Sequence, residues 1–556
     1  MDFEKLADLL FPDVTMTPDE IQAKYPARNL PEGAKVTRFA PSPTGYVHLG
    51  GFYQAILGEI LARQSGGVFY LRIEDTDSKR EVEGAAQALI NTLSHYGVHF
   101  NEGVTVDGET GIYGPYTQSK RVGIYHVFAK ELVKKGLAYP VFTTAEELEE
   151  LNKTDKKEEN KNKDWLAEAE LREKEKQKAR SVTLESVKEN LASNNPFVLR
   201  ILAEGDPNVK IPFTDLIKGK LEIPENNEDF VLLKSDGVPT YHFAHAVDDH
   251  LMGTTHVIRG EEWLPSLAKH LMLFKYLGFK PPKYLHTATI MRLDENGNKK
   301  KLSKRDMGAS MADYKSMGYA PECVMEYMLT ILNSNFEEWR VQNLDKSYKD
   351  FPFSIKKMST SGALFDINKL NDVSKNVVSR MSAETVYSRI LEWADEFDRN
   401  FADKLNEDRE YALKILSIGR GGKKPRKDYG KWQEAKDYMS LFYDEYFELI
   451  DRYPDNFDKN DIKSALTMFL ETFDYYDDQN VWFEKIKNIS DRLGYASDMK
   501  AYKENPDNYK GNVGDISMFI RIAVTGKTNS PDMYTIMQIL GKDKVQKRIK
   551  DILERL

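Results

Sequence analysis

The sequence predicts a doubly wound α/β domain with a parallel sheet, divided by an α+β insertion and followed by an all-α region. Three observations indicate this fold class. Apolar, β-type runs alternate with helical spacing over residues 35–110, β-type runs return after residue 211, and few strand signals occur beyond about residue 330. Strands that alternate with helices are typical of a parallel sheet covered by helices on both faces.

Length and composition are those of a multidomain globular chain. The 556 residues correspond to three or four domains at about 150 residues each. The single cysteine, Cys323, excludes an intramolecular disulfide and a multi-cysteine zinc site. The net charge is −9, so any contact with nucleic acid has to use local basic patches. The start "MDFEKLADLLFPDV" lacks the features of a signal peptide and no apolar run reaches membrane-spanning length, so we expect a cytoplasmic protein without a membrane partner.

The elements of the first α/β half follow one another in a regular order. Residues 1–34 form a short helical extension. "KVTRFAPS" predicts a strand that runs into a loop, a helix begins at Phe52, and "GVFYLRIED" predicts a compact strand that ends in acidic residues. "EVEGAAQALINTLSHYG" has helical spacing and a glycine stop at Gly97.

The sequence changes character in the insertion. "SKRVGIYHVFAKELVKKG" predicts a helix closed by Gly136, and we assign no role to the dense mixed-charge tract at 145–180, because such tracts are usually solvated helices. Beyond it, "DFVLLKSDGVPTYHFAHAVDDHLMG" and "THVIRG" are predicted as β-type chain. We divide the chain into five parts. They are a helical extension at residues 1–34, an α/β domain in two halves at 35–110 and 211–330, an insertion at 111–210, a connecting helical domain at 331–385 and an all-α region at 386–556.

A histidine and a glycine pair stand where a strand turns into a helix, in "RFAPSPTGYVHLGG". In a doubly wound fold the N–H groups of such a helix lie at the carboxyl edge of the sheet and favour phosphate. Gly50 and Gly51 lack Cβ atoms, so a base or ribose can approach the backbone closely, and His48 can donate to a phosphate oxygen. Taken alone, this pattern is more often an ordinary turn and helix cap.

A second motif, "KKKLSKRDMG" at 299–308, is strongly basic. Its cations are Lys299, Lys300, Lys301, Lys304 and Arg305. One interpretation is a solvated basic loop, which is the common case. The other is a mobile clamp in which lysines neutralise the charge that develops as a triphosphate loses pyrophosphate.

The order and separation of these two motifs within a divided α/β domain resemble class I aminoacyl-tRNA synthetases. Together, "RFAPSPTGYVHLGG", "LRIEDTD", "GPYTQSKR", "SDGVPTYHFAHAVDDHLMGTTHVIRGEEWLPS" and "KKLSKRD" are similar to bacterial-type glutamyl-tRNA synthetases. The resemblance covers about residues 35–310 and continues more weakly through "SGALFDINKL" and "FIRIAVTGKTNSPDMYTIMQILGKDKV". It implies a Rossmann-like catalytic domain, an inserted domain that binds the acceptor end of tRNA, and an all-α anticodon-binding region.

The activity that this resemblance implies has two steps. Glutamate and ATP form glutamyl-adenylate, and the glutamyl group then passes to the terminal adenosine 2′-hydroxyl of tRNA-Glu. ATP and Mg²⁺ are the implied cofactors, and the implied protein is a monomer. Alternatives that stay open are an enzyme that also charges tRNA-Gln with glutamate and a glutaminyl-tRNA synthetase. Intact "HLGG" and "KLSKR" argue against a non-catalytic RNA-binding paralogue, and the long helical half argues against a truncated tRNA-modifying paralogue.

The resemblance also implies which residues act in catalysis and in ATP binding. His48, Gly50, Gly51 and Lys304 are expected to bind ATP. The catalytic residues that it implies are His48, Gly50, Lys301, Ser303, Lys304 and Arg305.

The implied glutamate pocket contains Arg38, Ala40, Ser42, Glu74, Tyr241, His245 and Arg259. We expect Arg38 to bind the side-chain carboxylate, because a guanidinium binds a carboxylate through two parallel hydrogen bonds, and Glu74 to bind the amino group. From the residues alone, Arg38 is as well explained as a strand-end arginine, and Glu74 as a partner of Arg72 or Lys79. The chain departs from relatives at His245, where some have Asn, and at 52–54, where many have Ala-Arg-Thr.

Candidate tRNA contacts lie in two basic stretches. Lys120 and Arg121 belong to the insertion. Lys423 and Lys424 belong to "GRGGKKPRKDYGKW", for which phosphate contacts and a solvated loop are equally open interpretations.

Two further patterns suggest other ligands. His242, His245, Asp248, Asp249 and His250 are metal-ligand types, but in an extended run His242 and His245 would point to opposite faces. "TGKTNS" imitates the end of a phosphate loop without the required earlier glycine, and we expect a loop between helices instead.

We also expect no protein-bound zinc. Some relatives hold zinc with cysteines in an "AYxCFC" stretch, whereas this chain reads "AYPVFTT", with Val141 and Thr143 at those places.

Overall fold

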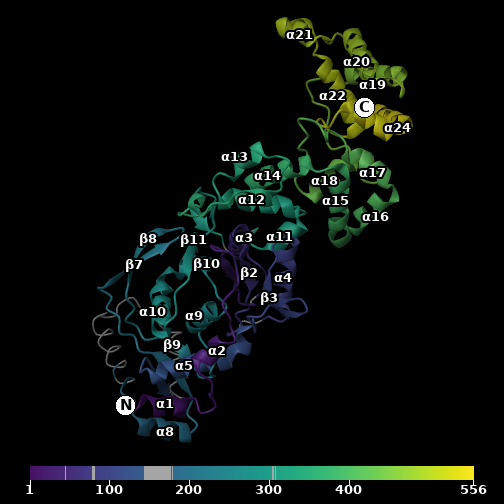
Figure 1. Ribbon diagram of the computed structural model, residues 1–556. Coiled ribbons are helices and arrows are strands. Elements are labelled where there is room, and N and C mark those ends of the chain that lie inside the picture. The colour runs from purple at the N-terminus through teal and green to yellow at the C-terminus, as the bar shows by residue number, and fades with distance from the viewer. Residues whose placement is uncertain (44, 78–81, 143–176, 178–179, 303–305, 307) are drawn as a thin grey trace, which may run out of the picture. The chain divides into compact units, whose positions relative to one another are not determined.

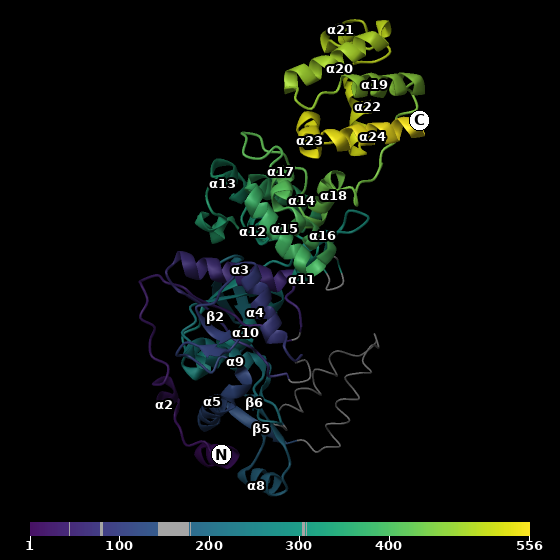
Figure 2. The same cartoon turned by 90° about the vertical axis from the view of Figure 1, so that its right-hand side faces the viewer.

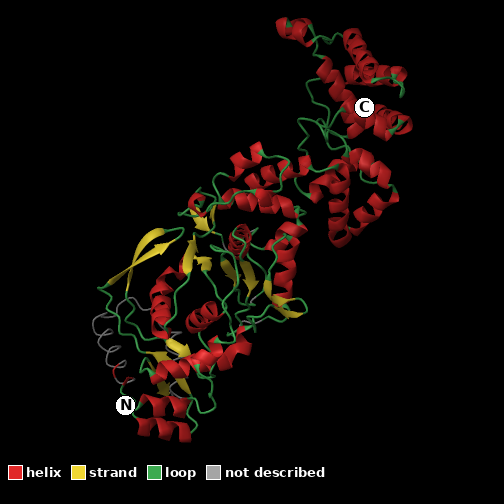
Figure 3. Cartoon of the chain, in the orientation of Figure 1, coloured by secondary structure: helices red, strands yellow, loops and turns green. Residues whose placement is uncertain are grey.

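The computed structural model describes the chain except residues 44, 78–81, 143–176, 178–179, 303–305 and 307. The chain forms two compact units: Met1–Asp313 with Met328–Asp366, and Tyr314–Tyr327 with Ile367–Leu556. Among the described residues every strand belongs to the first unit, and the second unit is helical (Figure 3). The predicted fold class is therefore confirmed, while the finer division into five domains remains a proposal.

The central sheet of the first unit joins two distant parts of the sequence. β1 (Val36–Phe39) pairs in parallel with β2 (Val68–Leu71), which pairs in parallel with β3 (Glu102–Thr105), and β4 (Gly108–Thr110) is antiparallel at the edge. β10 (His256–Gly260) pairs in parallel with β11 (Lys283–Thr287). The Thr255 N–H donates to the Val36 carbonyl at 3.0 Å, so β10 begins beside β1. The carboxyl ends of β1, β2, β10 and β11 therefore share one edge.

Helix α3 (Leu49–Gln64) follows β1 and packs closely on the sheet (Figure 1). Phe52, Ile56 and Leu57 on this helix are fully buried. At Gly58 an added Cβ would lie 2.7 Å from the Phe69 ring on β2, so only glycine permits this close approach. The other helices of the two α/β halves include α4 (Ala85–His95), α9 (Tyr241–Leu251) and α10 (Leu267–Leu277).

A second core lies in the insertion and the N-terminal extension. β5 (Ala138–Phe142), β6 (Phe197–Ile201) and β9 (Val231–Leu233) form an antiparallel sheet. Leu6 of the extension and Phe128 of the insertion belong to the same buried cluster, and Figure 2 shows the extension and insertion helices at one end of this unit. The remaining helices of this region are α1 (Phe3–Leu10), α2 (Pro18–Gln22), α5 (Val122–Lys134) and α8 (Leu184–Ala192), with the 3₁₀ turn η2 (Gln118–Arg121).

Two hairpins and several short helices complete the first unit. The hairpins are β7 (Lys210–Asp215) with β8 (Gly219–Pro224), and β12 (Met291–Leu293) with β13 (Lys299–Lys301). The short helical elements of this unit are η3 (Glu261–Ser266), α13 (Phe336–Gln342), η4 (Tyr348–Asp350) and η5 (Ile355–Lys357), while the residues of α11 (Met311–Ser316) and α12 (Pro321–Leu332) are divided between the two units.

One prediction about these elements is wrong. The run after Thr240 is predicted as β-type chain, but it forms helix α9, with Thr240 as an extended N-cap residue. The run contains no glycine or proline that would interrupt a helix, and its residues 243–249 are all buried, so no alternation between a buried and an exposed strand face remains. His242 and His245 therefore do not alternate between the faces of a strand.

The second unit is a set of helices around one apolar core, which includes Trp432, Phe469 and Phe519. The predicted loop at "TGKTNS" is confirmed, since Gly526 ends α22 with φ +74°. The helices are α14 (Ile367–Arg380), α15 (Ala383–Phe397), α16 (Arg399–Glu407), α17 (Arg409–Leu416), α18 (Trp432–Met439), η6 (Ser440–Phe442), α19 (Lys459–Thr472), α20 (Gln479–Leu493), α21 (Met499–Glu504), η7 (Pro506–Asn508), α22 (Val513–Thr525), α23 (Met533–Leu540) and α24 (Lys542–Arg555). None of the helices in the described part of the chain has the length and apolar character that crossing a membrane requires.

Candidate active site

The two sequence motifs meet at the carboxyl edge of the sheet. The Leu49 N–H donates to the Ala309 carbonyl at 2.9 Å, and the Met311 N–H donates to the Val47 carbonyl at 3.0 Å. The segment that follows "KLSKR" therefore runs beside the segment that contains "HLGG". Ser303, Lys304 and Arg305 lie outside the described residues.

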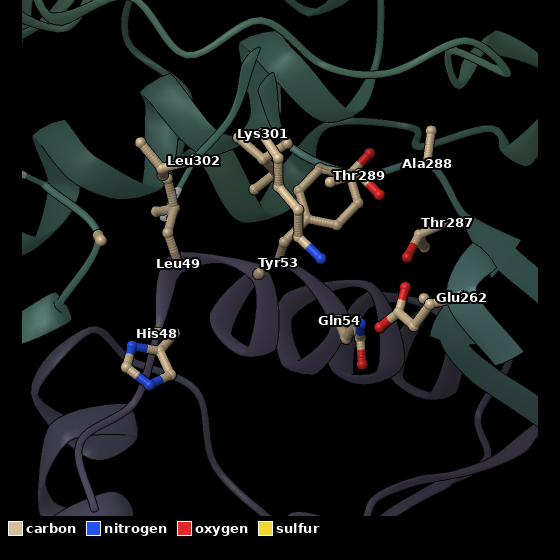
Figure 4. Close-up of a pocket in the computed structure, with 14 residues that line it drawn as sticks. His48, Leu49, Tyr53, Gln54, Glu262, Thr287, Ala288, Thr289, Lys301 and Leu302 are labelled. Atoms are coloured by element: carbon tan, nitrogen blue, oxygen red, sulfur yellow. The ribbon is translucent and has the colours of Figure 1, made fainter. Parts of the chain in front are cut away.

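A first cavity opens between these segments, and Figure 4 shows the side chains around it. Gln54 on α3 and Glu262 face each other there, with Thr287 beside Glu262. A Cβ atom at Gly50 would meet open space, in keeping with a helix start that a ligand can approach. The lining residues are His48, Leu49, Gly50, Tyr53, Gln54, Gly260, Glu262, Thr287, Ala288, Thr289, Ile290, Lys301, Leu302 and Ala309.

A second cavity adjoins the first, because Gln54 lines both. Six of the seven residues predicted for a glutamate pocket line it: Arg38, Ala40, Ser42, Glu74, Tyr241 and Arg259. Gly51 also lines this second cavity and is absent from the wall of the first. The predicted amino-acid residues are therefore brought together beside the predicted nucleotide residues.

A buried network of charges supports the wall of the second cavity. Arg72 donates through Nη1 to Asp249 Oδ1 at 2.7 Å and through Nη2 to Glu74 Oε1 at 2.9 Å. Arg38 Nε lies 3.3 Å from both carboxylate oxygens of Asp249, and its Nη1 donates to the Ile258 carbonyl at 3.2 Å. Glu74 therefore is a partner of Arg72, as one interpretation of the sequence held, and it lines the cavity as well.

The pKa values in this network follow from burial and from the arginines. Burial alone would favour the neutral acid, but Arg38 and Arg72 hold the pKa of Asp249 well below its usual value. Burial raises the pKa of Glu74, against the opposing charges of Arg72 and Arg38. A bound ammonium group beside Glu74 would lower that pKa again, since an opposite charge favours the ionised form.

His245 does not line either cavity and is a correction to the predicted pocket. Its side chain is fully buried, its Nδ1 lies 2.8 Å from Asp249 Oδ2, and its Nε2 is 2.9 Å from the Tyr284 hydroxyl. Burial lowers the pKa of His245 to about 4, so the ring is neutral at neutral pH. His245 supports Asp249 from behind the pocket wall.

The predicted tRNA contacts divide into exposed and buried side chains. Lys120 is exposed, although it lies 3.6 Å from Glu109, and Lys423 and Lys424 are exposed in the loop before α18. Arg121 has no exposed surface and donates through Nε to Asp248 Oδ1 at 2.7 Å. The prediction that Arg121 contacts tRNA is therefore wrong, because its guanidinium is already paired inside the first unit.

The metal interpretation of "HFAHAVDDH" finds no support in the geometry. No group of three or more metal-ligand side chains forms in the part of the chain that the structure describes. Asp248 instead accepts from Gln118 Nε2 at 2.9 Å and from the Tyr125 hydroxyl at 2.8 Å.

Several parts of the site are not among the predicted residues. Asp249 and Arg72 stand in the quoted motifs "AVDDH" and "LRIED", and Glu262 is the second residue after β10 in "RGEEW". The position at the carboxyl end of a strand was a signal that could have identified Glu262. Nothing in the local pattern shows that Asp249 joins Arg38 and Arg72, because Arg38 on β1 and Arg72 just after β2 are both distant from Asp249 in the sequence.

Comparisons with known proteins agree with this geometry. A family model described as "tRNA synthetases class I (E and Q), catalytic domain" matches residues 35–372, and a model described as "Anticodon binding domain" matches residues 433–553. Proteins named "Glutamate--tRNA ligase" from Acetivibrio thermocellus and Clostridium perfringens are 50% and 44% identical to this chain, each over 100% of both sequences. A solved glutamate tRNA ligase from Elizabethkingia meningosepticum, in complex with its amino acid, has a TM-score of 0.71 at 27% identity and covers 94% of this chain and 99% of its own.

A parallel sheet with "HLGG", Lys301 and Leu302 around a cavity at its carboxyl edge, followed by a helical region, is typical of a class I aminoacyl-tRNA synthetase. The matched catalytic model covers more than half of the chain, and the relatives align over its full length. The chain belongs to the class I tRNA synthetases of the E and Q family, and it is a ligase.

Proposed function

We propose that this protein ligates L-glutamate to the 3′ end of tRNA-Glu through glutamyl-adenylate, at the cost of ATP. One observation carries the choice of amino acid. Three of the charged side chains that line the second cavity are buried, namely the guanidinium groups of Arg38 and Arg259 and the carboxylate of Glu74, whereas Asp77, Lys234 and Asp236 on the same wall are not buried. Glutamate carries two carboxylates and one ammonium group, so its charges match these three side chains in sign and number.

Adenylation occurs where the two cavities meet. A glutamate α-carboxylate oxygen bonds to the α-phosphorus of ATP, the bond to the oxygen that bridges to the β-phosphate breaks, and pyrophosphate leaves with that electron pair. The enzyme contributes mainly by positioning and by stabilising charge. His48 and the start of α3 hold the triphosphate, and Lys301 neutralises negative charge as pyrophosphate departs. Lys304 and Arg305 share this role in the proposal and lie outside the described residues.

Mg²⁺ is part of the proposed reaction because it suits phosphate oxygens, which would be its main ligands. The first cavity fits a nucleotide–metal complex: it combines a helix N-terminus and Lys301 for phosphate with the single carboxylate of Glu262. Few protein ligands are needed there, since Mg²⁺ usually keeps several waters and binds through substrate phosphates.

Binding of tRNA uses the insertion and the helical region in this proposal. Lys120 is the candidate for the acceptor end, and Lys423 and Lys424 are candidates for backbone phosphates. The match to an anticodon-binding model supports a role of residues 433–553 in reading the anticodon. We further propose a cytoplasmic monomer without bound zinc.

Charging assays test the amino acid and the tRNA together. With purified tRNA-Glu, we expect glutamate to support ATP–pyrophosphate exchange and tRNA charging, whereas glutamine should not. Charging of tRNA-Gln with glutamate would identify the enzyme as non-discriminating. Exchange with glutamine in place of glutamate would overturn the proposed substrate.

A further inference from the structure

Arg259 differs from the other buried arginines at the site in the groups that its guanidinium contacts. It lies on β10, only 4% of its surface is exposed, and it lines the amino-acid cavity. Arg38 and Arg72 each pair with Asp249, whereas no carboxylate among the described residues pairs with Arg259. Its polar partners are two imidazoles, and its ring neighbour is Tyr284, whose centroid is 4.7 Å from Cζ.

Two series of hydrogen-bonded side chains lead to Arg259, one through His286 and one through His270. Arg259 Nε donates to His286 Nε2 at 2.9 Å, and His286 Nδ1 lies 2.7 Å from Asp215 Oδ2. Arg259 Nη1 lies 2.9 Å from His270 Nδ1, and His270 Nε2 lies 2.9 Å from His242 Nδ1. None of the four residues His286, Asp215, His270 and His242 lines either cavity.

The ring nitrogen that carries the proton in His286 and in His270 follows from the contact with Arg259. A guanidinium has only N–H donors, so the imidazole nitrogen that faces Arg259 has to be an acceptor in each series. His286 therefore carries its proton on Nδ1 and donates to Asp215, and His270 carries its proton on Nε2 and donates to His242. Burial lowers the pKa of His242 to about 4 and the pKa of His270 well below its ordinary value, which agrees with neutral rings.

Asp215, which bonds to His286, is fixed by several further hydrogen bonds. Asp215 is 1% exposed and accepts from the backbone N–H groups of Ile217 at 2.9 Å and Lys218 at 2.8 Å. It also accepts from the His286 N–H at 3.1 Å. Arg259 and His286 are direct partners in the parallel register of β10 and β11, so the backbone sets their spacing.

The guanidinium is thus held by neutral acceptors, and the Asp215 carboxylate is separated from it by the His286 ring. Its third nitrogen, Nη2, is buried and has no hydrogen-bond partner among the described residues. A buried donor without a partner is costly, so a ligand acceptor at this point would be favoured.

We propose that Asp215–His286 and His242–His270 are positioning residues, which orient Arg259 toward a carboxylate of the bound glutamate without neutralising it. This inference rests on the proposed function and extends the site to four residues behind the pocket wall. An acidic partner in place of these imidazoles would compete with the substrate carboxylate for the same charge.

Matched substitutions of His286 and His270 test the inference on the full-length enzyme. His286→Leu removes the acceptor for Arg259, whereas His286→Gln can place an oxygen near the position of Nε2. His270→Leu and His270→Asn form the corresponding pair for Nδ1. We measure KM for glutamate and for ATP in tRNA-dependent exchange, with His256→Leu as the control, because His256 is a buried imidazole on the same strand that bonds Thr255 instead.

Each Leu variant should raise KM for glutamate by about tenfold or more, with KM for ATP within about twofold, because a lost hydrogen bond to a charged group has this order of effect. The Gln and Asn variants should recover most of the loss, and His256→Leu should leave both KM values near wild type. Equal rises in both KM values, or no recovery by the amides, would overturn the inference. If one Leu variant fails to fold, the other pair decides. A wild-type enzyme inactive with glutamate would instead refute the proposed function, and this inference with it.

Discussion

Asp249 is the residue on which the geometry of two arginines at the amino-acid pocket depends. It is buried, accepts from Arg72 at 2.7 Å and contacts Arg38 at 3.3 Å. Removing one partner of a buried ion pair leaves an uncompensated charge, which costs about 3–5 kcal/mol. Arg38 is therefore held in one place by the protein while it still lines the cavity.

The first prediction concerns Arg38 itself. Arg38→Ala should raise KM for glutamate by about tenfold or more, because the charge-assisted bonds to a substrate carboxylate are lost. KM for ATP should stay within about twofold, since Arg38 does not line the nucleotide cavity. Arg63→Ala, at an exposed position of α3, serves as the control in exchange assays. Unchanged glutamate kinetics would show that another residue binds the carboxylate.

The second prediction concerns Lys301, which lines the nucleotide cavity. Lys301→Ala should lower the rate of adenylation more than it weakens ATP binding, because its charge matters most as pyrophosphate leaves. We expect the same result for Lys304→Ala. Rapid-quench measurement of adenylate formation, combined with equilibrium ATP binding, separates the two effects. Lys299→Ala is the control on the same strand, and equal losses in binding and rate would contradict the assigned role.

At the scale of elements, α9 and the helices of the second unit show how local sequence sets geometry. On α9, Tyr241, His245 and Asp249 recur every four residues, so a helix presents them on one side toward the pocket and its support. In the second unit an aspartate caps many helices by accepting from the first turn, at Asp398, Asp408, Asp458, Asp478, Asp498 and Asp532. Part of the Asp-rich composition of this half therefore has a structural cause.

The third prediction tests such a cap. Asp478 accepts from the N–H groups of Asn480 at 2.8 Å and Val481 at 2.9 Å, at the start of α20. Asp478→Ala should lower the free energy of unfolding of the second unit by about 1 kcal/mol, whereas Asp478→Asn should retain most of it. Chemical denaturation measures the difference, with the exposed Asp491→Ala on the same helix as the control. An alanine variant as stable as the asparagine variant would argue against the cap.

At the scale of the whole molecule, the titratable histidines are concentrated in one unit. All ten histidines precede residue 287, so the second unit contains none. Burial lowers the pKa of His242, His245 and His256 to about 4, from an ordinary value of 6.5. The unfolded chain therefore takes up protons at a higher pH than the folded first unit does.

The fourth prediction follows from that difference. Above pH 6.5 these histidines are neutral in the folded and unfolded states and contribute no pH dependence. As the pH is lowered from 6.5 to about 4, the unfolded state binds more protons than the folded state, so the free energy of unfolding of the first unit falls. Thermal unfolding followed by limited proteolysis and mass spectrometry assigns each transition to a unit. The first unit should lose thermal stability in this pH range more steeply than the second. Parallel behaviour of both units would refute the assignment.

By itself, the sequence determined the fold class and the order of strands and helices around "HLGG", because local periodicity and motif order carry that information. Through the family resemblance it also indicated six residues of the amino-acid cavity. Only the tertiary structure decided that Arg121 pairs with Asp248, that His245 stands behind the pocket, and that imidazoles hold Arg259. The physical reason is that burial and pairing arise between groups distant in the sequence, as for Arg121 and Asp248, which are separated by 127 positions. Whether a charged side chain faces a ligand or a buried partner is set by that folding, and no local pattern records it.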